Sequence, residues 1–275
     1  MAGKLYIVGT PIGNLSDFSP RGAETLSKVD FIAAEDTRVT VKLLNHLGIS
    51  KPMLSYYEHN KRERGGEIME RILAGENCAL VSDAGMPAIS DPGEELVALA
   101  YELGVSVESV PGPTAVATAL AISGMKSGRF CFEGFLSVNK PSRKAHLSEL
   151  IRETRTMVFY EAPHKLLATL KDMYSSFGDR KIAIVRELTK LHEQVIHTTL
   201  SEAINLYDDE KKARGEFVLI IEGYTPKEEE EFTLEQAVEF AKKYMEKGDP
   251  ASMAAKKAAT DTGLKKGDIY RLLIK

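Results

Sequence analysis

Residues 4–38, KLYIVGTPIGNLSDFSPRGAETLSKVDFIAAEDTR, contain the repeating unit that decides the fold. Two short apolar runs, residues 4–8 and 31–34, have the composition of buried β-strands, and a segment of helical period, residues 20–28, lies between them. Ser19 precedes Pro20 and is placed to cap this helix. A strand, a helix and a second strand in this order predict a parallel α/β sheet.

The alternation continues along the chain, so the predicted fold class is α/β. A Pro-Gly-Pro corner at 111–113 separates two halves, and we expect domains at 1–112 and 113–224. In the first half, further strands are predicted at 78–81 and 106–110 and further helices at 39–47, 62–74 and 92–103, the last capped by Asp91. In the second half, the predicted strands are 130–133, 156–160, 181–185, 194–198 and 216–221, and the predicted helices are 114–122, 141–153, 165–174 and 201–208.

Residues 225–275 form a third piece, an acidic linker at 225–232 followed by predicted helices at 234–247, 251–260 and 265–274. The last two helices fit a helix-turn-helix outline, and a simple packing hairpin is an equally good interpretation. The whole chain has a net charge of -4, which argues against binding nucleic acid through bulk positive charge. Six basic and two acidic residues nevertheless make 250–275 locally basic.

Composition places the chain among ordinary globular proteins, because 43% of its 275 residues are hydrophobic and 28% are charged. A disordered, collagenous or fibrous chain is thereby excluded. No apolar run approaches the roughly 18 residues that span a bilayer, and the first residues lack the pattern of a signal peptide, so we expect a cytoplasmic protein without a membrane segment. Cys78 and Cys131 lie in apolar runs, which is typical of buried thiols.

A turn-rich segment follows each of the first four predicted strands, and the second half repeats the pattern. These segments are 9–14, 35–38, 82–87 and 111–113, then 134–136, 161–164 and 187–190. Open parallel sheets bind ligands at the carboxyl ends of their strands, so we expect these loops to line one cleft. Gly9, Gly13 and Gly85 are interpreted as places where the backbone approaches the ligand closely.

Several catalytic motifs are absent from the sequence. There is no phosphate-binding loop of the type Gly-x-x-x-x-Gly-Lys-Ser/Thr and no Gly-x-Gly-x-x-Gly fingerprint with its distant acid. The six histidines form neither His-Glu-x-x-His nor a cluster with cysteine, and no Gly-x-Ser-x-Gly elbow occurs. We therefore expect a metal-free cleft for a bulky organic cofactor.

Seven ordered motifs carry a resemblance to a known family. They are GTPIGNL (9–15), EDTR (35–38), SDAGMPAISDPG (82–93), VPGPTA (110–115), FEGFL (132–136), YEAPH (160–164) and RELTK (186–190). The series is similar to that of the bacterial small-subunit rRNA 2'-O-methyltransferases, which belong to the tetrapyrrole (precorrin-type) methylase superfamily. The resemblance implies a fold of two α/β domains with a cleft between them, plus a small C-terminal helical module.

The resemblance also implies a reaction and its participants. The methyl group of S-adenosylmethionine would pass to the ribose 2'-hydroxyl of a cytidine in the decoding region of 16S rRNA, on the 30S subunit, and the enzyme would be a homodimer without a metal. The cofactor contacts that it implies are Pro11, Asp83, Ala84, Gly85, Met86, Ile89, Thr114, Ala115, Tyr160 and Leu188.

The reaction benefits from a base that takes the proton of the 2'-hydroxyl. Asp36 and Glu35 are the preferred candidates, and the other titratable residues of the predicted loops are alternatives. These alternatives are Glu161, His164 and Glu187. Arg38 and Lys190 are placed to hold a phosphate or polarise the attacking oxygen, unless each only forms a salt bridge within its loop.

Three stretches are candidates for contacts with RNA. His59, Lys61 and Arg62 belong to a polar, aromatic and basic stretch suited to stacking a base, or to a solvated loop above packed tyrosines. Lys140 and Arg143 follow the Gly-Phe-Leu turn. In the tail, the candidates are Lys256, Lys257, Lys265, Lys266 and Arg271, with an ordinary exposed helical face as the alternative.

Two other functions stay open at this point. A superfamily relative that methylates a small tetrapyrrole or a protein histidine derivative would have the same cleft. A non-catalytic RNA-binding module would keep the cleft without transferring a methyl group. The basic tail and the Glu-Asp-Thr-Arg loop favour the rRNA methyltransferase.

Overall fold

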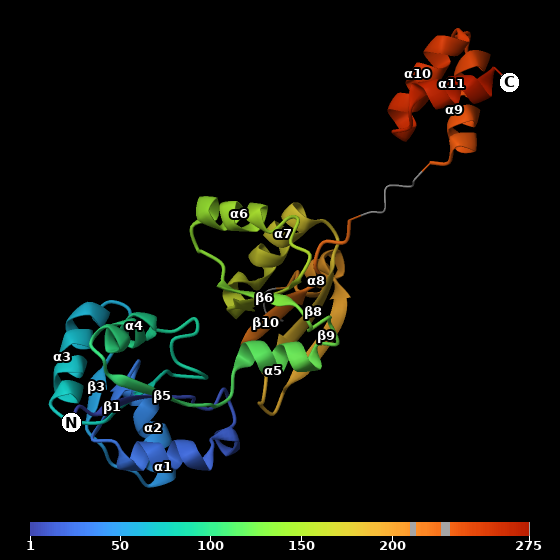
Figure 1. Cartoon of the computed structure of the whole chain (residues 1–275). Coiled ribbons are helices and arrows are strands. Elements are labelled where there is room, and N and C mark those ends of the chain that lie inside the picture. The colour runs from blue at the N-terminus through green and yellow to red at the C-terminus, as the bar shows by residue number, and fades with distance from the viewer. Residues whose placement is uncertain (210–212, 227–231, 275) are drawn as a thin grey trace. The chain divides into compact units, whose positions relative to one another are not determined.

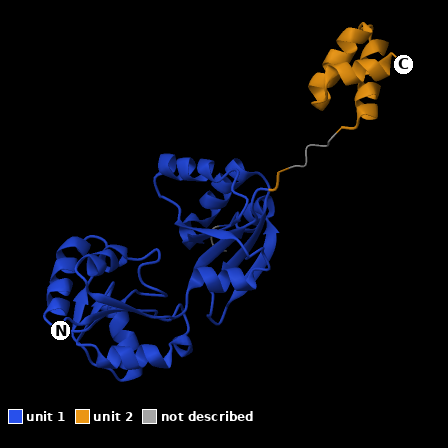
Figure 2. Cartoon of the chain, in the orientation of Figure 1, with its two compact units in different colours: residues 1–224 blue, residues 225–275 orange. Residues whose placement is uncertain are grey.

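The computed structural model describes residues 1–209, 213–226 and 232–274, which belong to two compact units, 1–224 (unit 1) and 225–275 (unit 2) (Figure 2). Most of the predicted acidic linker, residues 227–231, lies outside the described residues. In the part of the chain that is described, every helix is too short or too polar to cross a bilayer.

The first half of unit 1 is a five-stranded sheet in the order β3-β2-β4-β1-β5, and all neighbouring strands are parallel, as predicted (Figure 1). Its strands are β1 (Lys4–Val8), β2 (Phe31–Ala34), β3 (Met53–Ser55), β4 (Cys78–Val81) and β5 (Ser106–Val110). Its helices are the 3-10 turn η1 (Leu15–Asp17), α1 (Pro20–Lys28), α2 (Thr37–Leu47), α3 (Lys61–Leu73) and α4 (Glu94–Glu102). Strand β3 was not predicted, because three residues are too few to show a period.

Helices cover both faces of this sheet because its strands present apolar residues alternately to each side. Phe31 and Ala33 pack with α3 and α4, whereas Ile32 and Ala34 pack with Leu26 of α1 and other residues of the opposite layer. All four β2 residues are therefore buried, which is typical of a parallel sheet between two helical layers.

The predicted helix caps have different outcomes. The side chain of Ser19 accepts a hydrogen bond from the backbone N–H of Gly22 at 2.9 Å, which confirms its role as the N-cap of α1. The prediction for Asp91 was wrong, because α4 begins at Glu94 with Gly93 as an N-cap that makes no side-chain hydrogen bond. Asp91 lies three residues before α4 begins, with the Ser82 hydroxyl near its carboxylate.

The second half of unit 1 is a mixed five-stranded sheet in the order β6-β7-β10-β8-β9, in which only β6 and β7 are parallel. Its strands are β6 (Phe130–Phe135), β7 (Thr156–Glu161), β8 (Lys181–Arg186), β9 (Gln194–Thr199) and β10 (Phe217–Ile221). Its helices are α5 (Ala115–Ile122), α6 (Lys140–Glu149), the 3-10 turn η2 (Pro163–Lys165), α7 (Leu166–Phe177) and α8 (Leu200–Leu206). Strands β6, β7 and β8 run in one direction, so the loops after them reach the same edge.

Apolar clusters on the two faces of the second sheet hold its helices. One cluster joins the sheet to α6, α7 and α8, and the other joins it to α5. Ile12, from the loop after β1, belongs to the second cluster together with Leu120 of α5 and Val185 of β8. The core thus continues from the first loop into the second sheet.

Unit 2 is a small helical unit of α9 (Leu234–Glu246), α10 (Ala251–Thr262) and α11 (Lys266–Leu273). Alanines on α9 and α10 let the helices approach closely, and they bury Ile269 of α11 between them. Thr233 and Gln236 form a reciprocal capping box at the start of α9, and Gly263 ends α10 in the left-handed conformation.

Candidate active site

A cavity of about 400 Å³ lies where the loops of the two sheets of unit 1 meet. The first sheet contributes the loops after β1, β2 and β4, and the second contributes the ends of β6, β7 and β8 and the start of β10, while the first turn of α5 joins them. The lining residues are Ile12, Glu35, Asp83, Ala84, Gly85, Met86, Ile89, Ser90, Asp91, Thr114, Ala115, Val116, Phe135, Tyr160, Glu161, Ala162, Pro163, Val185, Leu188, Glu216, Phe217 and Val218.

Hydrogen bonds join the loops of the first sheet before any ligand is considered. The backbone of Thr10 exchanges two hydrogen bonds with that of Gly85, at 2.8 and 3.2 Å. The backbone N–H of Asp83 donates to the Glu35 carboxylate at 3.3 Å, and the backbone N–H of Asp36 donates to the Asp83 carboxylate at 3.1 Å. The cavity wall is therefore held in shape by the protein itself, which lowers the ordering cost of binding.

Backbone strain is concentrated in two loops at this cavity. Among the described residues, the non-glycine residues with positive φ are Ala88, Ser90, Glu187 and Thr189. The first pair flanks Ile89 and the second flanks Leu188, and both of these side chains line the cavity. Conformations of this kind cost about 1–3 kcal/mol each and persist where packing enforces them, commonly at functional sites.

The glycines of the first loop pack against protein. A Cβ on Gly9 would lie 2.7 Å from the Cα of Gly112, and a Cβ on Gly13 would lie 2.8 Å from the Cγ of Lys190. The interpretation that Gly9 and Gly13 make room for a ligand was therefore wrong, because neighbouring loops fill that space. Gly85 does line the cavity, with φ of 91°.

The cavity is acidic and otherwise largely apolar. Its described lining contains the carboxylates of Glu35, Asp83, Asp91, Glu161 and Glu216 and no lysine, arginine or histidine. Glu161 accepts hydrogen bonds from the Thr169 hydroxyl and the backbone N–H of Ala162, and Glu216 is paired with Lys190 at 2.9 Å.

The other carboxylates give the cavity its electrostatic character. Burial raises the pKa of the Glu35 carboxyl. Burial and the nearby charge of Glu35 raise the pKa of Asp91 to about 7. Such a lining favours a ligand that has a positive charge and an apolar surface.

The structure brings together nine of the ten residues predicted to contact the cofactor. Asp83, Ala84, Gly85, Met86, Ile89, Thr114, Ala115, Tyr160 and Leu188 all line the cavity. Pro11 is not among the lining residues, and its neighbour Ile12 takes that place.

Only one of the three predicted catalytic residues lies at the cavity. Glu35 lines the cavity, whereas Asp36 and Arg38 do not. The Arg38 side chain donates three hydrogen bonds to the Asp36 carboxylate, at 2.7, 3.0 and 3.1 Å, and this ion pair lowers the pKa of Asp36 to about 2. A carboxylate held in this way is a weak base at neutral pH.

An open groove with a volume of about 500 Å³ adjoins the cavity. Its lining residues are Glu35, Tyr57, Glu58, His59, Ser90, Asp91 and Pro92. Three of them, Glu35, Ser90 and Asp91, line the cavity as well. The predicted RNA contact His59 thus lies in a groove that shares a wall with the cavity.

The two basic neighbours of His59 differ in whether their charge is already paired with a carboxylate. Lys61 is paired with Glu58 and with Glu95, each at 2.8 Å. Arg62 is exposed. Of these two cations, only Arg62 presents a charge without an ion pair among the described residues.

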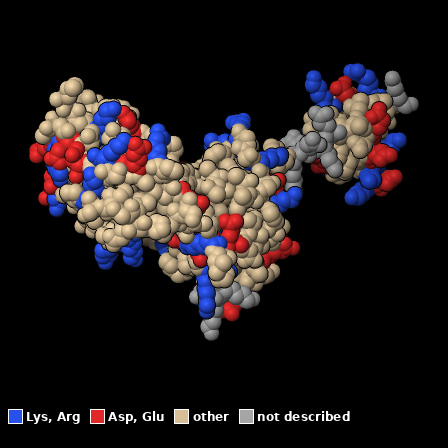
Figure 3. Space-filling view, turned by 90° about the horizontal axis from the view of Figure 1, so that it is seen from below, with Lys and Arg blue, Asp and Glu red and all other residues tan. Residues whose placement is uncertain are grey.

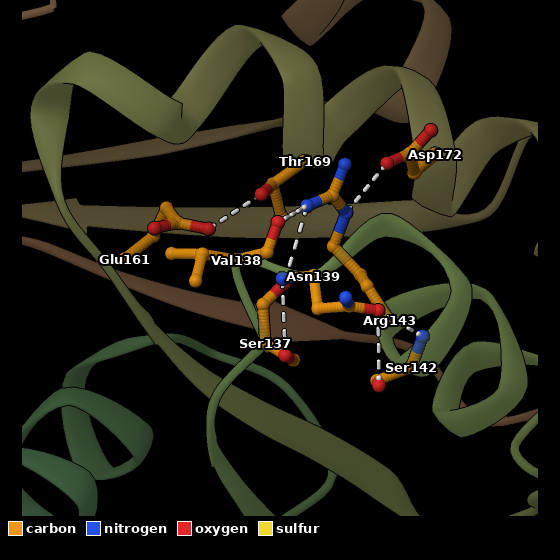
Figure 4. Close-up of polar contacts among 8 residues, drawn as sticks. All are labelled: Ser137, Val138, Asn139, Ser142, Arg143, Glu161, Thr169 and Asp172. Atoms are coloured by element: carbon orange, nitrogen blue, oxygen red, sulfur yellow. Dashed lines mark hydrogen bonds and ion pairs between the residues drawn. The ribbon is translucent and has the colours of Figure 1, made fainter.

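The predicted contacts Lys140 and Arg143 also lie in different surroundings. Arg143 is directed inward: its guanidinium is paired with Asp172 at 2.7 Å and donates to the backbone carbonyls of Ser137 and Val138 (Figure 4). It holds the loop before α6 in place. Lys140, at the start of α6, is exposed.

In unit 2, the predicted RNA contacts are all exposed, but several have partners. Lys257 is paired with Asp249 at 2.7 Å, and Arg271 lies 3.9 Å from Asp268. Lys266 donates to the Ser252 hydroxyl at 3.1 Å. On the face seen in Figure 3, basic and acidic side chains lie side by side over this unit.

Asp91 is one of the lining residues that sequence reasoning missed as part of the site. Its place in the Ser-Asp-Pro-Gly run before a helix suggested a cap, and its position at the wall between cavity and groove comes from the fold. The sequence did contain a signal for this role, because the Ser-Asp-Pro-Gly run belongs to the longest of the seven motifs, residues 82–93.

The fold agrees with the comparisons to known proteins. The family profile of the tetrapyrrole (corrin/porphyrin) methylases matches residues 4–204. A solved structure, uroporphyrin-III C-methyl transferase from Thermus thermophilus complexed with S-adenyl homocysteine, superposes with a TM-score of 0.57 at 18% identity, over 80% of this chain and 97% of that one. The chain thus belongs to the tetrapyrrole methylase family and has its fold, and the predicted fold class is confirmed.

Full-length relatives narrow the family further. A protein from Synechocystis sp. named "Ribosomal RNA small subunit methyltransferase I" is 48% identical over 98% of this chain and 97% of its own length. A protein of the same name from Thermotoga maritima is 48% identical over 221 residues, which are 99% of its length and 80% of this chain. The chain belongs to the ribosomal RNA small subunit methyltransferase I family.

Proposed function

We propose that this protein transfers the methyl group of S-adenosylmethionine to the 2'-hydroxyl of a cytidine in the decoding region of 16S rRNA, on the 30S subunit. The observation that carries the proposal is the acidic cavity that opens into a groove, in a chain whose near full-length relatives are named as rRNA methyltransferases. A homodimer in the cytoplasm is part of the same proposal.

The residues of the cavity fit the proposed cofactor. S-adenosylmethionine supplies a methyl group on a positively charged sulfur, together with an apolar adenine ring. The carboxylates of Glu35, Asp83 and Asp91 suit the positive charge, and Met86 and Leu188 supply apolar wall. The product, S-adenosylhomocysteine, lacks the sulfonium charge, so this lining favours the substrate over the product.

The protein's main contribution to the rate is alignment. Well-oriented reactants gain up to roughly 7–11 kcal/mol relative to reactants that meet in solution. The hydrogen bonds between Thr10 and Gly85 and between Asp83 and Glu35 keep the wall of the cavity in one arrangement. This rigidity is what a direct displacement at a methyl carbon requires.

The groove is the proposed place for the target nucleotide. Tyr57 and His59 are exposed there and contact each other edge to face, with ring centroids 6.2 Å apart. RNA-binding proteins commonly stack an extruded base on such side chains. Arg62 follows at the start of α3 and is suited to a phosphate.

Unit 2 is proposed to add affinity for RNA rather than catalysis. The Thermotoga maritima relative is matched over 99% of its length by 221 residues, and unit 1 of this chain has 224. A relative of that size has room for a counterpart of unit 1 alone. Exposed lysines such as Lys256 and Lys265 would then supply phosphate contacts outside the active site.

The proposal is tested by incubating the protein with methyl-labelled S-adenosylmethionine and either naked 16S rRNA or 30S subunits that lack the modification. We expect label on one cytidine of the 30S subunit, at a linkage that resists nuclease. Absence of label on both substrates, with cofactor binding shown by calorimetry, would refute the assignment. Labelling of a corrinoid in a parallel reaction would favour a small-molecule methylase, and light scattering of the eluted protein tests the homodimer.

A further inference from the structure

Only three described residues line both the cavity and the groove: Glu35, Ser90 and Asp91. Under the proposed function the cavity holds the methyl donor and the groove holds the nucleotide. The reacting oxygen must therefore lie close to the wall that the two spaces share. A group that accepts its proton has to be one of the polar side chains of this wall.

The two carboxylates of the shared wall are not equally free to accept a proton. Glu35 already accepts a hydrogen bond from the backbone N–H of Asp83 at 3.3 Å, which ties it to the neighbouring loop. Asp91 is half-buried, and the Ser82 hydroxyl near it donates to the backbone carbonyl of Gly85 at 3.4 Å. Ser90 is a hydroxyl and not a base at neutral pH.

The charges around Asp91 come from every element that surrounds the shared wall. Glu35 and Asp83 face it from the loops after β2 and β4, and Glu58 and His59 line the groove beside it. Tyr160, Glu161 and Glu216 line the cavity from the second sheet. Most of these groups are acidic, so the ionised form of Asp91 is disfavoured and its pKa is close to neutrality, which suits a general base.

We infer that Asp91 is the general base that takes the proton of the 2'-hydroxyl, an inference that rests on the proposed methyl transfer. The electron pair of the O–H bond stays on the 2'-oxygen and forms the new O–CH3 bond. The pair of the S–CH3 bond returns to sulfur, and the proton goes to the Asp91 carboxylate. The reaction needs no co-reactant besides the sulfonium methyl donor.

The test compares Asp91→Asn with Glu102→Gln, a control that removes one exposed carboxylate at the end of α4. Single-turnover methylation of 30S subunits is followed from pH 5.5 to 9 at saturating cofactor. In the wild-type protein and the control, the rate should rise with an apparent pKa near 7. In Asp91→Asn the rate should fall by roughly 10²–10⁴-fold and lose this acidic limb.

A second readout does not depend on activity. Carbon NMR of protein labelled at the aspartate carboxyls should show one group that titrates near neutral pH in the wild type and is missing in Asp91→Asn. Asp91→Glu keeps a carboxylate and should retain part of the rate and the pH dependence. If Asp91→Asn does not fold by circular dichroism, Asp91→Ser takes its place.

The outcomes separate this inference from the proposed function. A folded Asp91→Asn that binds cofactor and transfers methyl at the wild-type rate overturns the inference and leaves the function intact. A wild-type protein that binds cofactor and methylates neither naked rRNA nor 30S overturns the proposed function, and the inference falls with it. An unchanged aspartate titration in the variant also overturns the inference.

Discussion

The backbone N–H of Val116 donates a hydrogen bond to the phenol oxygen of Tyr160 at 2.9 Å, and this bond joins the first turn of α5 to the end of β7. Both residues line the cavity. Tyr160 also packs edge to face against Phe132 and Phe135, so its ring is fixed on two sides. A single side chain of the second sheet thereby sets the position of the helix that follows the Pro-Gly-Pro corner.

Tyr160→Phe should weaken cofactor binding without unfolding the protein. The change leaves the Val116 N–H without its partner, and a hydrogen bond of this kind contributes about 0.5–1.5 kcal/mol. We expect a loss of roughly 2- to 12-fold in affinity for S-adenosylmethionine by calorimetry. Tyr174→Phe, at an exposed position on α7, is the control, and equal affinity in the two variants would contradict the prediction.

Asp91→Asn should stabilise the protein in a pH-dependent way. The folded pKa of Asp91 is about 7 and lies above the ordinary value of about 3.9, so folding opposes its ionisation. Below pH 4 the carboxyl is neutral in both states and the variant gains nothing. The gain should grow from pH 4 to 7 and stay constant above that.

Urea unfolding of wild type and Asp91→Asn at pH 5 and pH 8 measures this difference in the free energy of unfolding. If the variant gains the same free energy of unfolding at pH 5 and at pH 8, Asp91 has an ordinary pKa in the folded protein and the prediction is wrong. Glu102→Gln should show no such dependence, since Glu102 is exposed.

Arg143 and Lys140 should respond differently to removal of their charge. Arg143→Met leaves Asp172 and two backbone carbonyls without their donor, so we expect a loss of about 1–3 kcal/mol in the free energy of unfolding. Lys140→Met should leave stability unchanged. If Lys140 contacts a phosphate, its loss should reduce the slope of log affinity against log salt by roughly 0.7–0.9. A stable Arg143→Met variant would show that the inward ion pair contributes little.

A chain that ends after residue 224 should remain folded and bind S-adenosylmethionine with unchanged affinity. Unit 1 has its own apolar clusters, and the described contacts of Ile269 and the alanines of unit 2 lie within unit 2. Binding to 30S subunits should weaken and become less sensitive to salt. Loss of cofactor binding in the shortened chain would contradict the proposal that unit 1 binds the cofactor and unit 2 adds affinity for RNA.

Gly112→Ala should destabilise the protein, because the new Cβ would lie 2.7 Å from the backbone oxygen of Gly9. Overpacking against backbone costs about 1–3 kcal/mol. Gly66→Ala, in α3, meets no atom within 4 Å and should be neutral or stabilising by up to about 1 kcal/mol. Thermal unfolding of both variants checks the contrast, and a stable Gly112→Ala would show that the two loops can separate.

Much of the fold could be predicted from the sequence because helices and strands depend on near neighbours. The period of two or 3.6 residues, Ser19 before Pro20 and the Gly and Pro loops all lie within short segments. The predicted ends of β1, β2, β4 and β5 agree with the structure. The directions of β9 and β10 could not be predicted this way, because strand pairing joins residues far apart in the sequence.

The sequence by itself determined the elements of this protein, the loops that carry its motifs and the family to which it belongs. Only the tertiary structure decided what each charged side chain does. Asp36 and Asp91 each follow a strand in a motif loop, but Asp36 is paired with Arg38 in the first turn of α2, whereas Asp91 lines a cavity among carboxylates from several elements. A pKa and a hydrogen-bond partner depend on burial and on distant neighbours, and these exist only after the chain has folded.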